Sequence, residues 1–162
     1  MLQIDIRHGT AEDTKLITDF IRSMVTETAL YGGHAVNESP EVWSSMAEFV
    51  KANCIRKDCI YLIASIRSPV QKTVGFAAAN LKSLDNVFTA KKRLHISAVY
   101  TDPNMRRHGI AIQLIQKTLD WGRRMNAEEA DLNVLAANPS RQLYEQLGFQ
   151  QHEITMVKKL DR

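Results

Sequence analysis

The spacing of apolar positions changes several times along the chain, and each spacing predicts a type of element. Residues 2–6 alternate between apolar and polar, which is the two-residue period of a strand. Apolar residues between Leu16 and Val25 recur every three or four positions, which is the period of a helix. Thr10 and Asp13 precede them as a capping box. A strand followed by a helix therefore opens the chain.

A second helix is predicted to begin at Pro40, because proline is favoured in the first turn of a helix. Trp43, Met46 and Val50 follow at helical spacing. The segment between the two helices, Tyr31 to Pro40, contains two adjacent glycines and is predicted to be a loop.

Three strands are predicted in the middle of the chain, at Ile60 to Ile66, Val74 to Leu81 and Leu94 to Thr101. The first two are joined by RSPVQKT, and SLDNVFTAKK precedes the third. Since these strands follow one another through short connections, we expect them to pair antiparallel.

The last third of the chain predicts a helix, a strand, a short helix and a strand: Ile110 to about Met125, Asp131 to Ala136, Ser140 to Leu147, and a final strand ending near Lys159. A strand–helix–strand crossover makes the two strands that it joins parallel. The predicted fold class is therefore α+β, with a mixed, twisted sheet flanked by about four helices.

Composition limits the class of protein. A chain of 162 residues with 44% hydrophobic and 24% charged residues predicts one globular domain, residues 1–162. The longest apolar run, Ile60 to Ile66, is far too short to span a membrane. The N-terminus lacks the pattern of a secretory signal, so we expect a cytoplasmic protein with Cys54 and Cys59 reduced and no metal site.

The stretch DPNMRRHGIAIQLIQKTLDW, residues 102–121, suggests a binding site for an anion. Proline at 103 ends a strand, and a helix begins within a few residues at Gly109. The tight turn between them directs unpaired backbone N–H groups, from about Arg107 to Ala111, at one point near the positive end of the helix dipole. Arg106 and Arg107 can add charge-assisted hydrogen bonds. A phosphate or pyrophosphate fits such a site, and the alternative is a capped helix with exposed arginines.

The chain contains neither a P-loop nor the glycine fingerprint of dinucleotide-binding proteins. Instead, RRHGIA, residues 106–111, matches [QR]-x-x-G-x-[GA], and the sequence thereby resembles the GNAT superfamily of acyl-CoA N-acyltransferases. HISAVYTDP, before the loop, is similar to the strand of that family that ends in a Val-Asp-Pro-like turn. NPSRQLYEQLGF is similar to its N-x-x-A-x-x-x-Y-x-x-x-G-F element, except that Arg141 stands where the family more often has alanine.

This resemblance implies a GNAT-type fold and the transfer of an acetyl group from acetyl-CoA to a primary amine by direct attack. It implies that the backbone N–H of Val99 polarises the thioester carbonyl, that Thr101 and Asn138 hold the pantetheine arm, and that Tyr144 protonates the departing thiolate. The residues that it assigns to the pyrophosphate are Arg106, Arg107, His108, Gly109, Ile110 and Ala111.

The general base has three candidates. His95 and Ser97 alternate with Leu94, Ile96 and Ala98, so they are predicted to face away from a core side. Arylalkylamine N-acetyltransferases, which belong to this family, have a similarly placed histidine, so the resemblance makes His95 a base or a water-relay residue; the alternative is a solvated strand histidine. Glu27 and His34 are its rivals.

The loop containing Tyr31 and His34 lies where this family usually builds its acceptor pocket, so both residues are candidate substrate contacts; the alternative is that they are simply turn residues.

Two other functions remain open from the sequence. One is a catalytically idle acyl-CoA-binding or regulatory domain that keeps the loop without a competent base. The other is a nucleic-acid-binding module that uses Lys91 to Arg93 and Arg106 to His108, against which the formal net charge of only +3 argues. The expected partners are a small-molecule or peptide amine and, as in many relatives, a second copy of the chain in a homodimer; no nucleic-acid or membrane partner is expected.

Overall fold

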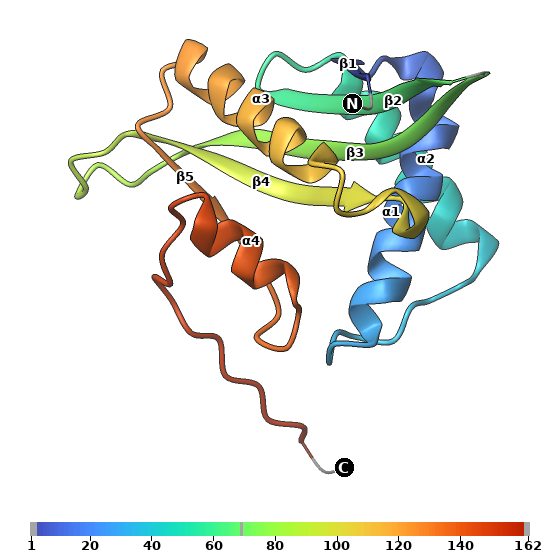
Figure 1. Ribbon diagram of the computed structural model, residues 1–162. Coiled ribbons are helices and arrows are strands. Elements are labelled where there is room, and N and C mark those ends of the chain that lie inside the picture. The colour runs from blue at the N-terminus through green and yellow to red at the C-terminus, as the bar shows by residue number, and fades with distance from the viewer. Residues whose placement is uncertain (1–2, 69, 161–162) are drawn as a thin grey trace.

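The computed structural model describes residues 3–68 and 70–160, which form five strands, four α-helices and two short 3-10 helices (Figure 1). The strands are β1 (Ile4–His8), β2 (Cys59–Ser68), β3 (Val70–Ser83), β4 (Lys92–Thr101) and β5 (Glu129–Leu132). The helices are α1 (Thr14–Ala29), α2 (Pro40–Cys54), α3 (Ile110–Arg124) and α4 (Ser140–Gln146). The 3-10 helices are η1 (Ala11–Asp13) and η2 (Pro103–Met105).

The strands form one sheet in the order β1-β2-β3-β4-β5. The first four pair antiparallel with their neighbours, and β5 pairs parallel with β4 after the crossover through α3. The mixed α+β sheet with four α-helices that the sequence predicts is thus confirmed.

Helices cover both faces of this sheet (Figure 1). On one face, α3 packs the buried residues Ile110, Leu114, Ile115 and Trp121 against Leu94 and Ile96 of β4 and apolar residues of β2 and β3. On the other face, Ile17 of α1 and Val50 of α2 pack against Ile63, Phe76 and Ala98. The α1–α2 pair and α3 therefore hold β4 between them, with its C-terminal end open at the loop that leads to α3.

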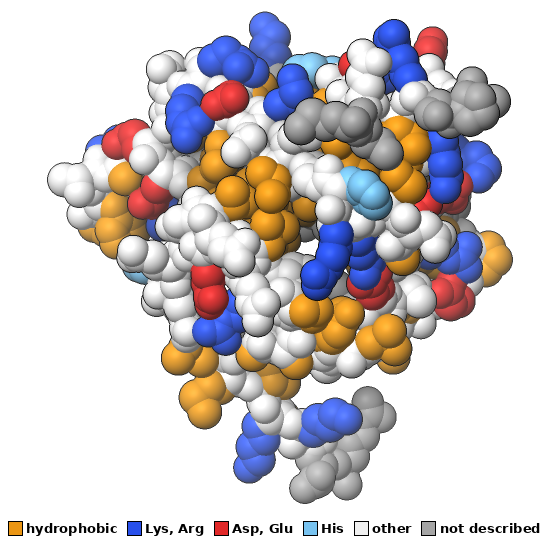
Figure 2. Space-filling model, viewed as in Figure 1, with side chains coloured by type: hydrophobic (Ala, Val, Ile, Leu, Met, Phe, Trp, Pro, Cys, Tyr) orange, Lys and Arg blue, Asp and Glu red, His pale blue; other side chains and the backbone are white. Residues whose placement is uncertain are grey.

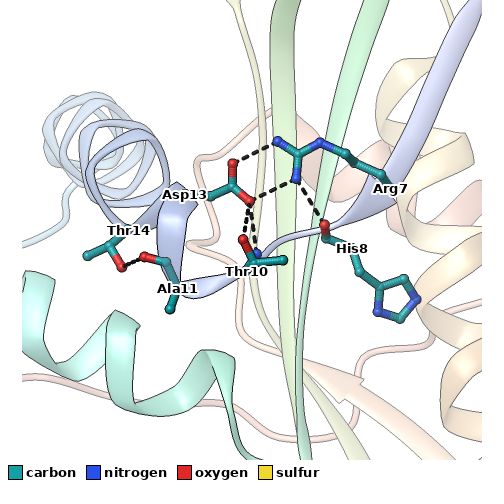
Figure 3. A network of polar contacts seen from close by, with 6 residues as sticks. All are labelled: Arg7, His8, Thr10, Ala11, Asp13 and Thr14. Atoms are coloured by element: carbon teal, nitrogen blue, oxygen red, sulfur yellow. Dashed lines mark hydrogen bonds and ion pairs between the residues drawn. The ribbon is translucent and has the colours of Figure 1, made fainter.

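A polar network fixes the start of α1 against β1 (Figure 3). Asp13 accepts two hydrogen bonds from the guanidinium of Arg7, at 2.7 and 2.8 Å, and further bonds from the backbone N–H and the hydroxyl of Thr10. The bond from Arg7 contributes most to lowering the pKa of Asp13 from 3.8 to about 2. The capping box expected from the sequence is present.

Several predicted boundaries are wrong. β2 and β3 continue their pairing through Arg67↔Gln71, so most of the predicted connection 67–73 is strand; its residue 69 lies outside the described residues, as does Leu2 of the first predicted strand. The connecting residues are largely polar, and burial therefore gives no signal of where pairing stops.

The two predicted C-terminal strands need larger corrections. The strand expected at 131–136 is instead β5 at Glu129–Leu132, because its pairing with β4 ends at Ile96↔Leu132 and no strand among the described residues lies beside the residues that follow. The final strand expected to end near Lys159 does not form: residues 150–160 are extended and exposed, and they run away from the sheet (Figure 1).

The predicted faces of β4 are also wrong, because a β-bulge interrupts the alternation of its side chains. Ala78 pairs with Ala98 and Ala79 pairs with Ile96, so Ser97 is the extra residue. Leu94 and Ile96 therefore face α3, whereas Ala98 packs with the α1 side. The three do not share one face, as simple alternation had predicted.

Candidate active site

β4 and β5 separate after a short paired stretch. The last paired residues are Ile96 and Leu132, and β4 continues to Thr101 while the chain after Leu132 turns towards α4. In the part of the chain that the structure describes, residues 97–101 have no strand on their β5 side. The separation leaves a gap along the edge of β4, and apolar surface lies between α3 and α4 in Figure 2.

The backbone of β4 directs hydrogen-bonding groups into this gap. Asp102 donates its N–H to the carbonyl of Val74 at 2.8 Å, and Thr101 pairs with Gly75. In the alternating antiparallel ladder, this makes Thr101 and Val99 non-hydrogen-bonded positions, whose N–H and C=O groups point away from β3. The hydroxyl of Thr101 is also buried without a hydrogen-bond partner among the described residues. The predicted roles of Val99, polarising the thioester carbonyl, and of Thr101, holding the pantetheine arm, both require backbone groups that point into the gap.

The loop from β4 to α3 presents a cluster of backbone N–H groups. Arg107 (φ 64°) and Gly109 (φ 77°) both adopt left-handed conformations, which curl the turn. Within residues 3–68 and 70–160, no acceptor bonds the N–H groups of residues 107–112, and a Cβ added to Gly109 would meet nothing within 4 Å. Such a concave turn at a helix N-terminus binds anions.

The loop residues divide into exposed and structural ones. Arg107 and His108 are exposed, and Nδ1 of His108 lies 2.8 Å from the carbonyl oxygen of Arg106, so the ring helps to hold the turn. Ile110 is 1% exposed and anchors α3 in the core, which leaves only its N–H available to a ligand. Figure 2 shows basic side chains on this face near the loop.

Arg106 is paired with α1. Its guanidinium lies 2.5 Å from the carboxylate of Glu27, and its Nε donates to the carbonyl of Thr101 at 3.3 Å. Glu27 is the largest contribution to the raised pKa of Arg106. Two predicted site residues from distant parts of the sequence thus meet beside the loop, and the carboxylate of Glu27 is engaged as an ion-pair partner.

His95 forms a second polar pair, one residue before the point where β4 and β5 separate. Its Nδ1 lies 2.8 Å from Oδ1 of Asp131, which pairs with it in register on β5. Arg93 holds the same carboxylate at 3.3 Å and also bonds Glu129. The His95 side chain is 14% exposed, so it is a partly buried histidine rather than a solvated one. A proton on Nδ1 leaves Nε2 as the acceptor.

Tyr144 and Asn138 lie on the far side of the gap, at α4. Tyr144 packs edge-on against Phe149 with ring centroids 6.1 Å apart, and burial raises the pKa of its phenol above 10. Burial is the cause of this shift, and no hydrogen bond from the described residues contributes to it. Asn138 uses its side-chain oxygen to accept the N–H of Ser140 at 2.9 Å, which leaves its amide N–H groups for another acceptor.

The two predicted acceptor contacts have different surroundings. Tyr31 is half-buried and close enough to Arg106 to influence the pKa of that guanidinium, whereas His34 is exposed. A hollow of about 300 Å³ lies between α1 and the end of β4, and neither Tyr31 nor His34 lines it. Its lining consists of Leu16, Asp19, Phe20, Ser23, Tyr100, Asp102 and Pro103.

Neither a metal site nor a membrane-spanning helix occurs among the described residues. No group of three or more His, Cys, Asp or Glu side chains in residues 3–68 and 70–160 is arranged to hold a metal ion. Within the same ranges, every helix is too short or too polar to cross a membrane.

Comparison with known proteins assigns the family. Residues 29–149, well over half of the chain, match the acetyltransferase (GNAT) family, and the chain belongs to that family. An uncharacterized N-acetyltransferase of Methanocaldococcus jannaschii is 27% identical over 95 residues, which are 55% of this chain but 42% of that protein. The chain thus matches less than half the length of this relative.

Solved structures share the fold at low sequence identity. The aminoglycoside N-acetyltransferase AAC(6')-Iy in complex with CoA is 18% identical with a TM-score of 0.74, covering 99% of this chain and 96% of that one. A protein of Clostridium acetobutylicum described as a predicted acetyltransferase, solved with acetyl-CoA, is 16% identical with a TM-score of 0.79, covering 97% and 96%. Both confirm the GNAT-type fold.

The sequence missed three features of the site. Asp131 was predicted only as the start of a strand, and its partnership with His95 depends on the parallel register of β4 and β5. The ion pair between Glu27 and Arg106 joins residues 79 positions apart, with no local signal. The bulge at Ser97 has no signal in the sequence, because the alternation of Leu94, Ile96 and Ala98 continues across it.

Proposed function

We propose that this protein transfers the acetyl group of acetyl-CoA to a primary amine by direct attack. The observation that carries the proposal is the separation of β5 from β4 after Ile96. It leaves the outward-facing backbone of Val99 in a gap, and the free N–H groups of residues 107–112 lie at the end of the same strand. Family membership supports a transferase, and the two CoA-bound structures of the same fold support the cofactor.

The chain offers groups that suit the parts of acetyl-CoA. The N–H groups of residues 107–112 suit a pyrophosphate, with Arg107 available for a further charge contact. The pantetheine arm carries amides, and an exposed strand edge pairs with such groups as it would with an added strand. Thr101, on β4, and the side-chain amide of Asn138, before α4, would hydrogen-bond these amides from the two sides of the gap.

Acetyl-CoA supplies an activated thioester. In the proposed reaction, the amine nitrogen forms a bond to the acetyl carbon while the carbon–sulfur bond breaks. The N–H of Val99 stabilises the charge that develops on the carbonyl oxygen. Tyr144 donates its proton to the sulfur, and the raised pKa of its phenol keeps that proton available at neutral pH.

The proton lost by the amine passes to His95. Asp131 holds the imidazole through Nδ1 and leaves Nε2 free to accept. His95 and Val99 are four residues apart on β4, about 13 Å at about 3.3 Å per residue, so water carries the proton between the amine and the ring. Glu27 is the weaker candidate for the base, because its carboxylate is held by Arg106. Tyr31 and His34 remain the proposed acceptor contacts.

The experiment must distinguish an active acetyltransferase from a domain that binds acyl-CoA without catalysing transfer. The purified protein is given acetyl-CoA and a panel of primary amines: amino acids, polyamines, aminoglycosides, arylalkylamines and lysine-containing peptides. Release of free thiol is followed. We expect release that depends on one class of amine and falls in His95→Gln and Tyr144→Phe. Tight binding of acetyl-CoA with no release above hydrolysis for any amine would contradict catalysis and support the idle domain.

A further inference from the structure

The ion pair between Glu27 and Arg106 joins helix α1 to the turn that leads into α3. Nη2 of Arg106 lies 2.5 Å from Oε2 of Glu27, and Nε of Arg106 donates to the carbonyl of Thr101 at 3.3 Å. The side chain of Arg106 therefore contacts α1 and the last residue of β4 at the same time. Because Arg106 is also the first residue after η2, this contact is made where the turn begins.

The turn itself, residues 106–109, has little support from its own backbone. The N–H groups of residues 107–112 have no acceptor among the described residues. Arg107 and Gly109 are both left-handed, at φ 64° and 77°, and this conformation is unfavourable for a residue that has a Cβ. A strained turn of this kind keeps one conformation only where its surroundings hold it.

Side chains hold the two ends of the turn. At the end nearer α3, Ile110 is 1% exposed and packs in the core. At the end nearer β4, the backbone N–H of Arg106 lies 3.5 Å from the carbonyl of Pro103, which is too long for a strong hydrogen bond, so its side chain makes the firm contacts. Nδ1 of His108 lies near carbonyls of the loop itself and does not tie the turn to a helix. Glu27 is thus the helix contact that fixes the start of the turn.

We propose that Glu27 is a positioning residue for acetyl-CoA, because it holds Arg106 and thereby fixes the N–H groups of residues 107–112 in the arrangement that receives the pyrophosphate. A site that is already ordered loses less conformational freedom on binding, and its affinity is higher for that reason. The proposal rests on the assignment of this loop to acetyl-CoA. It gives Glu27 no part in moving a proton.

Charge alone predicts the opposite effect of Glu27 on affinity. A carboxylate near an anion site repels the phosphates, and it also occupies the charge of Arg106. Glu27→Gln would remove both effects and tighten binding if charge decided the outcome. Positioning predicts weaker binding, since glutamine keeps the size of the side chain but loses the charge-assisted bond to Arg106. The direction of the change therefore separates the two explanations.

Calorimetric titration of the full chain with acetyl-CoA is the first measurement. Glu27→Gln should bind about fivefold more weakly than the wild type, the effect of losing one ordered side-chain contact. Arg106→Gln should lose at least as much. The double variant Glu27→Gln/Arg106→Gln should bind no more weakly than Arg106→Gln, because Glu27 acts through Arg106. The control is Glu38→Gln, which breaks the ion pair of Glu38 with Arg22 and should leave the affinity unchanged.

Backbone relaxation of the ligand-free protein, measured by NMR, is the second readout and does not depend on acetyl-CoA. Order parameters of residues 107–109 should be near about 0.85 in the wild type and fall below about 0.6 in Glu27→Gln. Those of α3 should not change. Glu38→Gln should keep a rigid turn, since its ion pair is with α1 outside this loop.

Several results would overturn the proposal. Equal or tighter binding of acetyl-CoA by Glu27→Gln would show that charge outweighs positioning, and an equally rigid turn in that variant would show that Glu27 does not order it. Unchanged affinity with a large fall in kcat would return Glu27 to the role of base. In each of these cases the wild type still binds acetyl-CoA, so the proposed function stands. A wild type that binds no acetyl-CoA would overturn the loop assignment together with this proposal.

Discussion

Nδ1 of His95 lies 2.8 Å from Oδ1 of Asp131, and the two residues are paired in register on parallel strands. The pair is near the point where β4 and β5 separate, so the same pairing that opens the gap also orients the imidazole. Arg93 holds the other oxygen of Asp131 at 3.3 Å, which fixes the carboxylate in turn.

Replacing His95 tests its role as the base. His95→Gln removes the proton acceptor, and general-base catalysis contributes about 100-fold or more, so kcat should fall by at least that factor while the affinity for acetyl-CoA stays within about twofold. Steady-state kinetics and calorimetry measure the two quantities. His8→Gln, an exposed histidine on β1, is the control and should leave both unchanged. Full activity in His95→Gln would remove it from the mechanism.

Asp131 is a positioning residue in this account. Asp131→Asn should lower kcat about tenfold with little change in KM, because the ring loses its charged partner but the substrate loses no contact. Asp131→Glu keeps a carboxylate and should recover part of the loss. If Asp131→Asn and Asp131→Glu lower kcat only in proportion to their loss of thermal stability, Asp131 is a structural residue and does not position the imidazole.

Tyr144→Phe removes the proposed acid while keeping the ring that packs on Phe149. We expect kcat to fall about tenfold or more without loss of acetyl-CoA affinity. Since burial raises the pKa of the Tyr144 phenol from its usual value of about 10, the wild type should show no loss of activity from its ionisation below about pH 9. Tyr61→Phe, on the α1 face of the sheet, is the matched control and should retain activity. Equal kcat in both variants would contradict the assignment.

Gly109→Ala tests the anion site. A left-handed alanine costs about 1–2 kcal/mol of stability, and the new methyl group would stand in the open space at Gly109. Affinity for acetyl-CoA should therefore fall at least tenfold. Gly32→Ala introduces similar backbone strain (φ 89°) in another loop with nothing within 4 Å, and it should lose stability without losing affinity. Equal losses of affinity in both variants would show that strain alone is responsible.

The Arg7–Asp13 pair predicts acid sensitivity. The pKa of Asp13 is about 2 in the folded protein against 3.8 in the unfolded chain, so its ionised form stabilises the fold by about 2 kcal/mol at neutral pH. This contribution is complete above the unfolded pKa and is lost as pH falls from about 4 through 2. Between pH 5 and 3, urea unfolding should show the wild type losing about 1 kcal/mol more than Asp13→Asn. Identical pH dependence in the two would contradict the pair's role.

Local sequence signals predicted much of this fold, and pairing between distant residues accounts for what they missed. Apolar spacing placed α1 to α4 within a few residues, and the turn after Asp102 was found because proline and glycine restrict the backbone locally. The end of β5, the bulge at Ser97 and the course of residues 150–160 depend on which strands lie beside one another. The contacts of His95 with Asp131 and of Glu27 with Arg106 also join residues far apart in the sequence, so no local signal predicts them.

Calorimetric titration with acetyl-CoA tests the central claim, that the β4–β5 gap and the β4–α3 loop bind this cofactor. The wild type and Arg106→Glu are titrated at moderate salt, with ATP as a second ligand. We expect micromolar affinity for acetyl-CoA, no binding of ATP, and at least tenfold weaker acetyl-CoA binding in Arg106→Glu, which sets a like charge beside the phosphates. No heat with acetyl-CoA for a folded wild type, or equal affinity in the two proteins, would contradict the assignment.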